Sequence, residues 1–280
     1  MSELEDIESA LLSAKKLITE LEKQRDNTFV CFIEMGGAIN IKTAYRMNKL
    51  LRRITRKENL DLLIESGGGD LNSAAKIASI FRKYFKTYTA IIPFFAKSAA
   101  TFLALKADKI ILCKAGELGP IDPQVKHPAA DIWIPAHSIK EAIEFIESTR
   151  DPLVKLALAE KLDPWLIGAY KDAEKAAKQY VYEIFEKLQL DDDEKSEHTH
   201  VFTGKFRSHG YPIDIEVCKS LKLNLEEIDE KTERKIYELH EIYVDLYFNL
   251  KVDRLSIIQT SQKYDVEVNN ENITCKLASE

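Results

Sequence analysis

A triple glycine and a serine are the residues whose types and positions best suit anion binding and nucleophilic catalysis. Gly67-Gly68-Gly69 follows the apolar run 60–65, and Ser98 stands between the apolar run 88–93 and the small residues Ala99-Ala100-Thr101. Glycines let the backbone turn several N–H groups toward one point, where an anion or a developing oxyanion can bind. A serine that opens a helix can present its hydroxyl as a nucleophile. A turn without a ligand and an N-cap serine would explain the same residues.

Short apolar runs alternate with helical patterns over the first half of the chain. We expect strands at 29–35, 60–65, 88–93 and 109–113, and helices at 41–57, 71–85 and 97–106. Such alternation with short links is typical of a parallel sheet with crossover helices. The triple glycine and Ser98 end successive strands, so both should lie at the carboxyl edge of the sheet. A nucleophile beside backbone donors is the minimum arrangement for acyl transfer.

The remaining chain is mainly helical. An amphipathic helix is expected at 2–26, docking on its own chain or on another subunit. Further expected elements are helices at 138–148, 151–189 and 224–250, a polar acidic break at 191–196, and short strands within 255–278. We expect three parts: an N-terminal helical arm at 1–27, a catalytic domain at 28–223, and a C-terminal helix with short strands at 224–280. The helices 2–26 and 224–250 are candidate interface elements.

Composition limits the class of protein. The chain has 280 residues and a formal net charge of −6, with 45% hydrophobic and 31% charged residues. This mixture excludes a wholly disordered chain, and the negative charge disfavours nucleic acid as a partner. We expect the protein in the cytoplasm with reduced thiols, since it shows neither a secretory leader nor an apolar stretch long enough to span a membrane. Peripheral membrane contact stays open.

Three features resemble ligand sites without their full pattern. The basic segment 41–57 could contact nucleic acid or an acidic partner, and a solvated face explains it better. The segment 36–43 lacks the second glycine of a P-loop, because Ile41 occupies that place. His198, His200, His209 and Cys218 lack metal-site spacing, and we expect solvated histidines and no metal.

Four stretches, in this order, resemble the Clp-protease/crotonase superfamily. They are Ile64-Glu65-Ser66-Gly67-Gly68-Gly69-Asp70, Ala96-Lys97-Ser98-Ala99-Ala100-Thr101, Gly119-Pro120-Ile121-Asp122-Pro123-Gln124, and Phe202 to Ile213 with its His-Gly-Tyr-Pro-Ile ending. Within the superfamily the chain is most similar to the serine dehydrogenase proteinase family, akin to signal peptide peptidase A. The resemblance spans about residues 28–225. It implies an α/β spiral of strand-strand-helix units with an added N-terminal helix and a C-terminal extension.

The resemblance also implies roles for residues. Ser98 would be the nucleophile, and Gly68 and Ala99 would donate backbone N–H groups to the oxyanion. The chain around Gly68-Gly69 would pair with an extended substrate. The position that holds the catalytic histidine in Clp proteases is Asp122 here, and His127 lies a little further on.

The base is therefore expected to differ from that of Clp proteases. The signal-peptide-peptidase branch uses a Ser-Lys dyad, whose lysine follows the serine by several tens of residues. Lys140 falls in that interval, and Lys155 lies further along. A lysine acts as a base when its surroundings lower its pKa from ~10.4 toward neutrality, and the apolar neighbours of Lys140 favour this residue. Lys97 adjoins the serine but is expected to point elsewhere.

The predicted function is an ATP-independent serine endopeptidase, a hydrolase with nucleophile Ser98 and base Lys140. It needs no cofactor or metal, acts on a peptide or protein substrate, and assembles as a homo-oligomer. Two alternatives remain open. A crotonase-like enzyme would use the same oxyanion hole on an acyl thioester, and a catalytically silent scaffold would use none of it. Labelling by a serine-reactive probe separates the peptidase from both alternatives, and affinity for acyl-CoA separates the two alternatives from each other.

Overall fold

The computed structural model describes residues 3–126, 133–186, 188, 190–269 and 274–278. Contacts group the chain into two compact units. The first joins residues 1–119 with 212–280, and the second comprises 120–211. The arm at 1–27 and the segment 224–280 thus share a unit with the first strands. The three-part domain division stays a prediction.

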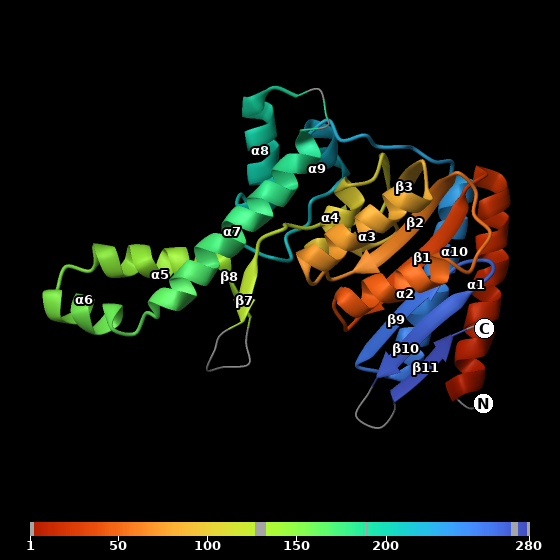
Figure 1. Ribbon diagram of the computed structural model, residues 1–280, viewed down its shortest axis with the longest axis horizontal. Coiled ribbons are helices and arrows are strands. Elements are labelled where there is room, and N and C mark those ends of the chain that lie inside the picture. The colour runs from red at the N-terminus through yellow and green to blue at the C-terminus, as the bar shows by residue number, and fades with distance from the viewer. Residues whose placement is uncertain (1–2, 127–132, 187, 189, 270–273, 279–280) are drawn as a thin grey trace. The chain divides into compact units, whose positions relative to one another are not determined.

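A mixed sheet forms the centre of the first unit (Figure 1). Its strands run in the order β11-β10-β9-β1-β2-β3-β5. β1 (Thr28–Met35), β2 (Asn59–Ser66), β3 (Thr87–Ile92) and β5 (Lys109–Leu112) are parallel, as expected from the alternating pattern. β9 (Arg254–Gln259), β10 (Tyr264–Asn269) and β11 (Thr274–Ala278) extend the β1 edge in antiparallel fashion. Two short strands, β4 (Phe95–Ala96) and β6 (Glu117–Leu118), continue from the end of β2.

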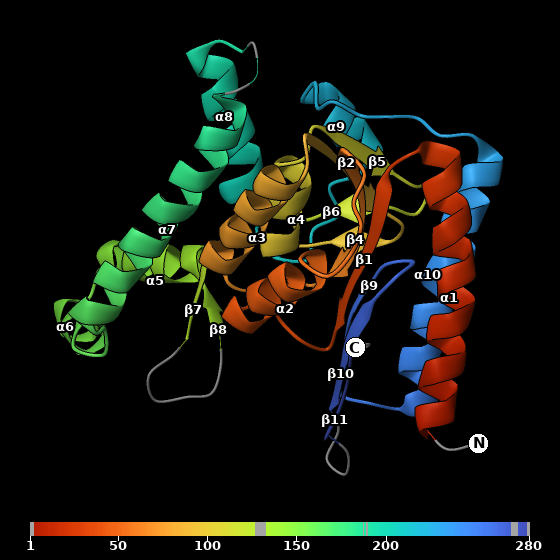
Figure 2. The ribbon, with the colours of Figure 1, turned by 45° about the vertical axis from the view of Figure 1, so that its right-hand side comes forward.

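Helices cover both faces of this sheet (Figure 2). α2 (Ile41–Leu51), α3 (Leu71–Tyr84) and α4 (Ala99–Leu105) cover one face, and α1 (Glu3–Arg25) and α10 (Glu230–Leu250) cover the other. A short helix, α9 (Ile215–Ser220), lies between β6 and α10 in the chain order of the unit. A hydrophobic core lies between α1, α10 and the sheet, where alternate residues of β1 point, among them Phe29, Cys31 and Ile33.

The N-terminal helix docks on its own chain. Ile7, Leu11, Ala14, Ile18 and Leu21 form its buried stripe, and all five belong to the core shared with α10 and the sheet. The apolar stripe that made this helix a candidate interface element is therefore used within one chain. The spacing of these residues follows the 3.6-residue period of a helix buried on one side.

Two helices in this unit are shorter than the sequence pattern predicts. α2 ends at Leu51 rather than Lys57, because Ile54 turns into the core and the Thr55 N–H donates to Gln262 Oε1 at 2.9 Å instead of to a helical carbonyl. α10 begins at Glu230 rather than at residue 224. The preceding segment is extended and pairs with β5, where the Glu226 N–H donates to Ile110 O at 2.9 Å. Asp229 then caps the helix by accepting from Thr232.

The second unit is mainly helical. It contains β7 (Gln124–Lys126), β8 (Trp133–Pro135), α5 (Ala136–Ser148), α6 (Pro152–Ala159), α7 (Pro164–Phe185) and α8 (Asp192–Thr203). The helical region expected at 151–189 is divided into α6 and α7, since Asp163 caps a new helix whose first residue is Pro164. A proline disfavours helical backbone in the residue before it and suits the first helical position.

The acidic segment 191–196 is the start of a helix and not a break. Asp191 and Glu194 form a capping box, with both reciprocal hydrogen bonds present. Acidic side chains are stabilising at a helix N-terminus, where the backbone N–H groups leave partial positive charge. His198 of this helix is buried and meets the Phe185 ring edge-on, so the expectation of a solvated histidine is wrong at this position. Across the described residues, no helix is both long and apolar enough to cross a bilayer.

Candidate active site

The triple glycine forms a turn that requires glycine. Gly68 and Gly69 have φ values of +105° and +141°, a region that residues with side chains rarely adopt. The turn is fixed to a neighbouring segment, because Ile39 N–H donates to Gly68 O at 2.7 Å and Asp70 N–H donates to Ile39 O at 2.8 Å. Asp70 then caps α3. One side of the chain at Gly68-Gly69 is thus paired with the segment at Ile39.

Ser98 has a strained turn backbone rather than that of an ordinary helix cap. Its φ and ψ are 50° and −120°, and its side chain makes no capping hydrogen bond to α4. A positive φ is strained for a residue with a Cβ, and such strain is typical of functional turns. The side chain is half-buried. Ser98 therefore does not cap α4 through its hydroxyl, although its position in the sequence allowed that role.

The structure brings the glycine turn and Ser98 together. A Cβ added at Gly68 would lie 2.6 Å from Ser98 Cβ, 2.7 Å from Lys97 O and 3.0 Å from Ala99 N. The two segments are also bonded directly, because Lys97 N–H donates to Ser66 O at 3.0 Å. The expected meeting of the two turns at the carboxyl edge of the sheet is confirmed.

Two backbone N–H groups flank this position. Ala99 is the first residue of α4, so its N–H has no acceptor within the helix. The Gly68 N–H donates to Ser66 Oγ at 3.1 Å. A carbonyl oxygen that enters here would share or replace the Ser66 hydroxyl as acceptor. The arrangement can therefore stabilise negative charge on an oxygen bound between Gly68 and Ala99.

Lys97 is occupied elsewhere, as the sequence predicts. Its Nζ pairs with Glu117 and donates to Leu118 O at 3.2 Å, both on β6. These contacts tie the residue before Ser98 to the neighbouring short strand. Lys97 thus supports the turn.

A buried ionisable pair lies directly behind the glycine turn. Glu65, the residue before Ser66, hydrogen-bonds to His240 Nε2 of α10, and both side chains are buried. The His240 ring also stacks on Phe94, with ring centroids 6.4 Å apart. One side chain of α10 therefore contacts both the strand that leads to Gly68 and the segment that leads to Ser98. No local sequence pattern predicts this pair, because its members are far apart in the chain.

The lysines considered as base lie in the second unit. The Lys140 side chain is 76% exposed and its Nζ lies 3.7 Å from Glu144 Oε1, one turn along α5. Lys155 Nζ donates to Glu147 O at 2.8 Å. His127 lies outside the described residues. The role of Lys140 stays a prediction, as do the roles assigned to Ser98, Gly68, Gly69 and Ala99.

A histidine and a carboxylate meet within the second unit. His209 Nδ1 lies 2.6 Å from Asp122 Oδ1. Asp122 is buried, and its Oδ2 has no hydrogen-bond partner among the described residues. A carboxylate on one ring nitrogen fixes the orientation and the tautomer of a histidine, which is how a histidine base is positioned in serine hydrolases. Both residues stand in motifs that resemble the family, but no local sequence pattern pairs them.

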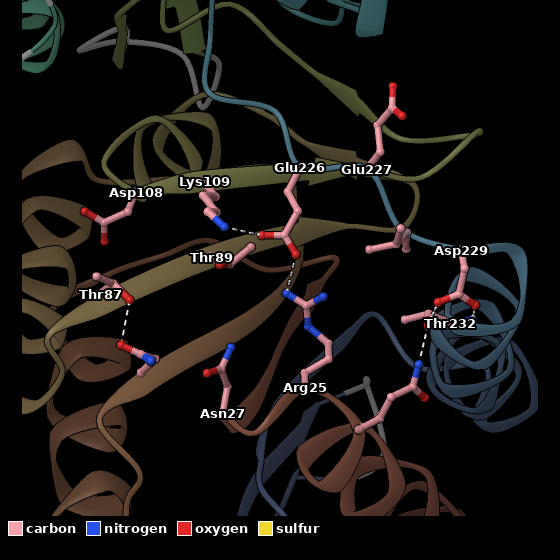
Figure 3. Close-up of a pocket in the computed structure, with 13 residues that line it drawn as sticks. Arg25, Asn27, Thr87, Thr89, Asp108, Lys109, Glu226, Glu227, Asp229 and Thr232 are labelled. Atoms are coloured by element: carbon pink, nitrogen blue, oxygen red, sulfur yellow. Dashed lines mark hydrogen bonds and ion pairs between the residues drawn. The ribbon is translucent and has the colours of Figure 1, made fainter.

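The cavity drawn in Figure 3 lies at the opposite edge of the sheet. It has a volume of about 480 Å³ and is lined by residues at the amino ends of the parallel strands, among them Asn27, Asn59, Thr87 and Lys109. Its two cations are both paired: Arg25 bonds Glu226 of the lining and the neighbouring Asp61, and Lys109 Nζ lies 3.0 Å from Glu226 Oε2. Burial raises the pKa of Glu226, but the hydrogen bonds from Lys109 and Arg25 outweigh it and leave that pKa below its ordinary value. This cavity is separate from Ser98.

Thiol and metal chemistry have little support in the described residues. Burial raises the pKa of the Cys31, Cys113 and Cys218 thiols to about 12, so each is protonated at neutral pH and a poor nucleophile. No group of three His, Cys, Asp or Glu side chains is close enough to hold a metal ion within the described ranges.

The sequence matches a known protein family over most of its length. The family model for ClpP-like SDH-type serine proteinases matches residues 6–253. Two uncharacterized proteins of Methanocaldococcus jannaschii, MJ1495 and MJ0137, are 26% and 27% identical to the chain over 245 and 243 residues. These alignments cover 83% of this chain, and 77% and 79% of the two relatives.

Two solved structures show a weaker similarity to the chain. A serine-to-alanine mutant of the 1510-N membrane-bound stomatin-specific protease gives a TM-score of 0.46 at 13% identity, covering 74% of this chain and 81% of that chain. A mutant of ClpP1 from Listeria monocytogenes gives a TM-score of 0.40 at 14% identity, covering 76% of this chain and 98% of that chain.

Proposed function

Because this chain belongs to the family of ClpP-like SDH-type serine proteinases, we propose that it hydrolyses peptide bonds through Ser98. The observation that carries the proposal is the approach of the Gly68 backbone to Ser98 and Ala99, together with the strained backbone of Ser98. A half-buried hydroxyl without a capping hydrogen bond is available for attack. Two backbone N–H groups beside it can receive the charge that attack creates.

The proposed reaction has two halves. Ser98 Oγ attacks the carbonyl carbon of a peptide bond, its proton passes to a base, and the resulting oxyanion accepts hydrogen bonds from Gly68 and Ala99. The carbon–nitrogen bond then breaks, the amine leaves with the proton from the base, and an ester remains on Ser98. Water hydrolyses that ester and restores the hydroxyl. The substrate strand pairs beside Gly68-Gly69, on the side that Ile39 does not occupy.

A serine-reactive phosphonate tests the nucleophile. The protein should gain the mass of one phosphonyl adduct, located on Ser98 by peptide mapping. Ser98→Ala should gain none, whereas Ser79→Ala, which removes an exposed hydroxyl of α3, should label like the parent. Labelling of Ser98→Ala at the parent rate would refute Ser98 as the nucleophile.

We propose Lys140 as the base, as the Ser-Lys dyad of the signal-peptide-peptidase branch suggests. A second candidate is His209, favoured by its 2.6 Å contact with Asp122. The two assignments predict opposite results. With Lys140 as base, Lys140→Ala abolishes phosphonate labelling while Lys155→Ala and His209→Ala retain it.

Loss of labelling in His209→Ala, with Lys140→Ala unchanged, would transfer the role to the histidine. In that case Asp122→Asn should lower the labelling rate as well, because the neutral asparagine amide cannot offset the positive charge that His209 gains when it accepts the serine proton. Far-ultraviolet circular dichroism of each variant identifies loss of labelling that comes from misfolding.

The finer properties of the enzyme are also proposals. We propose that it acts without its own ATPase, as a homo-oligomer, in the cytoplasm. Family membership supports oligomer formation, and sedimentation equilibrium of the full chain measures it. Cleavage of an unfolded protein in the absence of nucleotide tests independence from ATP.

A further inference from the structure

The helices on one face of the first unit carry cations and no acids. Residues 41–57, which comprise α2 and the turn after it, contain seven Lys or Arg and no Asp or Glu. Residues 71–86, which comprise α3 and its end, contain four Lys or Arg and again no acid. The chain as a whole has a net charge of −6. We call the exposed side of these two neighbouring helices the basic face.

Most of these cations are exposed and have no acidic partner. Arg46 is buried and anchored, and Lys57, Arg82 and Lys86 pair with acids outside the two segments. Seven further side chains are exposed and make no ion pair with any described residue: Lys42, Lys49, Arg52, Arg53, Arg56, Lys76 and Lys83. Like charges held close together without counter-charges favour a polyanionic partner.

Apolar side chains stand among these cations. Ile41 is 53% exposed and Tyr45 is 71% exposed, both on the outer side of α2. Tyr45, Asn48, Lys49, Arg52 and Arg53 together line an open hollow of about 410 Å³. Exposed aliphatic and aromatic groups beside Lys and Arg are typical of helices that rest at a membrane surface, where the rings and chains enter the headgroup region.

The buried Arg46 fixes the orientation of this face. Its guanidinium bonds Asp265 Oδ1 at 2.6 Å and Ser256 Oγ at 2.6 Å, and so holds the inner side of α2 on β9 and β10. The outer side of α2 is therefore presented in one orientation. Because these cations lie on a helix that is already folded, binding of a charged surface requires no folding of this segment.

We propose that the basic face binds an anionic phospholipid surface. Each Lys or Arg near such a surface contributes about a fivefold gain in affinity, so several acting together give firm binding without any spanning segment. Single-stranded nucleic acid fits less well, because it is bound by rows of exposed aromatic rings. On these helices Phe81 and Phe85 are buried, and the Tyr84 ring is covered by Arg56. Within this described part of the chain, Tyr45 is therefore the one exposed ring that a base could stack on. This inference does not depend on the chemistry of Ser98.

Vesicle co-sedimentation of the full chain tests the proposal. Phosphatidylcholine vesicles with and without phosphatidylserine are compared at low and at high ionic strength. The protein should bind the anionic vesicles preferentially, and salt should weaken binding because it screens exposed charges. Equal binding to both vesicle types would overturn the proposal. So would tight binding to an RNA or DNA oligonucleotide without binding to anionic vesicles.

Variants locate the surface. Lys49→Gln, Arg52→Gln and Arg53→Gln combined should lower the partition coefficient about 100-fold, at a fivefold loss per cation. The matched control removes three exposed cations of α1, Lys15→Gln, Lys16→Gln and Lys23→Gln, and should retain most of the binding. An equal loss in the control would refute the location. Should the first variant fail to fold, Lys76→Gln with Lys83→Gln on α3 tests the same face and should lower binding about 25-fold.

Discussion

At the scale of single residues, the site depends on a close approach that a side chain would prevent. Gly68 has a φ of +105°, and an added Cβ would lie 2.6 Å from Ser98 Cβ. Gly67, its neighbour in the same turn, has nothing within 4 Å of an added Cβ. A side chain is therefore sterically excluded at Gly68 but not at Gly67, a difference that the run of three glycines does not reveal.

Replacement of each glycine by alanine should separate these roles. Gly68→Ala should reduce the rate of phosphonate labelling at Ser98 by about 100-fold or more, since loss or displacement of one oxyanion donor has effects of that size. Gly67→Ala should label at nearly the parent rate. Pseudo-first-order labelling rates from intact-mass spectra give the comparison. Equal rates for the two variants would show that the Gly68 backbone does not face the reacting serine.

Sequence reasoning found the residues that lie in continuous motifs and missed those that meet through the fold. Ser98 and Gly68 each follow an apolar strand, so parallel-sheet geometry alone places them together. The pairs His209–Asp122 and His240–Glu65 join segments that no local pattern connects. Their partners depend on tertiary packing, which a single sequence does not reveal.

At the scale of elements, a buried arginine fixes α2 on the sheet. Arg46 is 5% exposed and bonds Asp265, Ser256 and Glu267 of β9 and β10. These strands belong to the C-terminal extension, so the ion pair joins the extension to the catalytic sheet. A buried charge is stable when its hydrogen-bonding capacity is filled, as it is here by two carboxylates, a hydroxyl and two backbone carbonyls.

Loss of Arg46 should destabilise the fold strongly. Arg46→Ala leaves the buried Asp265 carboxylate without its cation, and we expect a decrease of about 3 kcal/mol or more in the free energy of unfolding. Lys49→Ala, on the same helix but exposed and without an ion pair, should change it by less than about 0.5 kcal/mol. Urea unfolding followed by circular dichroism measures both. A similar small change in both variants would show that the Arg46 cluster adds no net stability.

The ends of helices were the least predictable part of the fold, whereas the ends of the parallel strands were predicted well. The strands at 28–35, 59–66 and 87–92 agree with the expected runs to within one residue or two, because an apolar run bounded by polar residues has clear limits. The helix expected at 151–189 divides at Asp163-Pro164, a capping pair within an otherwise continuous helical pattern. α2 stops early because Ile54 is buried and Thr55 bonds a side chain of a distant turn.

At the scale of the whole molecule, one ionic cluster joins three distant parts of the first unit. Arg25 ends α1, Lys109 starts β5, and Glu226 lies in the extended segment before α10. The Glu226 carboxylate receives hydrogen bonds from both cations, one from Arg25 at 2.9 Å. This cluster, visible in Figure 3, ties the end of α1 and the segment before α10 to the sheet at the edge opposite Ser98.

Acid should release this cluster. The pKa of Glu226 is lower in the folded protein than its ordinary value of 4.5, since hydrogen bonds from Lys109 and Arg25 outweigh burial. A carboxyl group with a lowered pKa contributes stability above its unfolded pKa, and this contribution is lost as pH falls through the folded pKa.

The parent should therefore be more stable than Glu226→Gln near neutral pH, and the difference should shrink steadily as the pH falls below 4.5. Glu227→Gln, which removes an exposed acid next in the chain, should follow the parent at every pH. Urea unfolding of all three proteins between neutral and acidic pH measures the differences, and a constant offset between the parent and Glu226→Gln would show that the carboxylate charge is not what stabilises this edge.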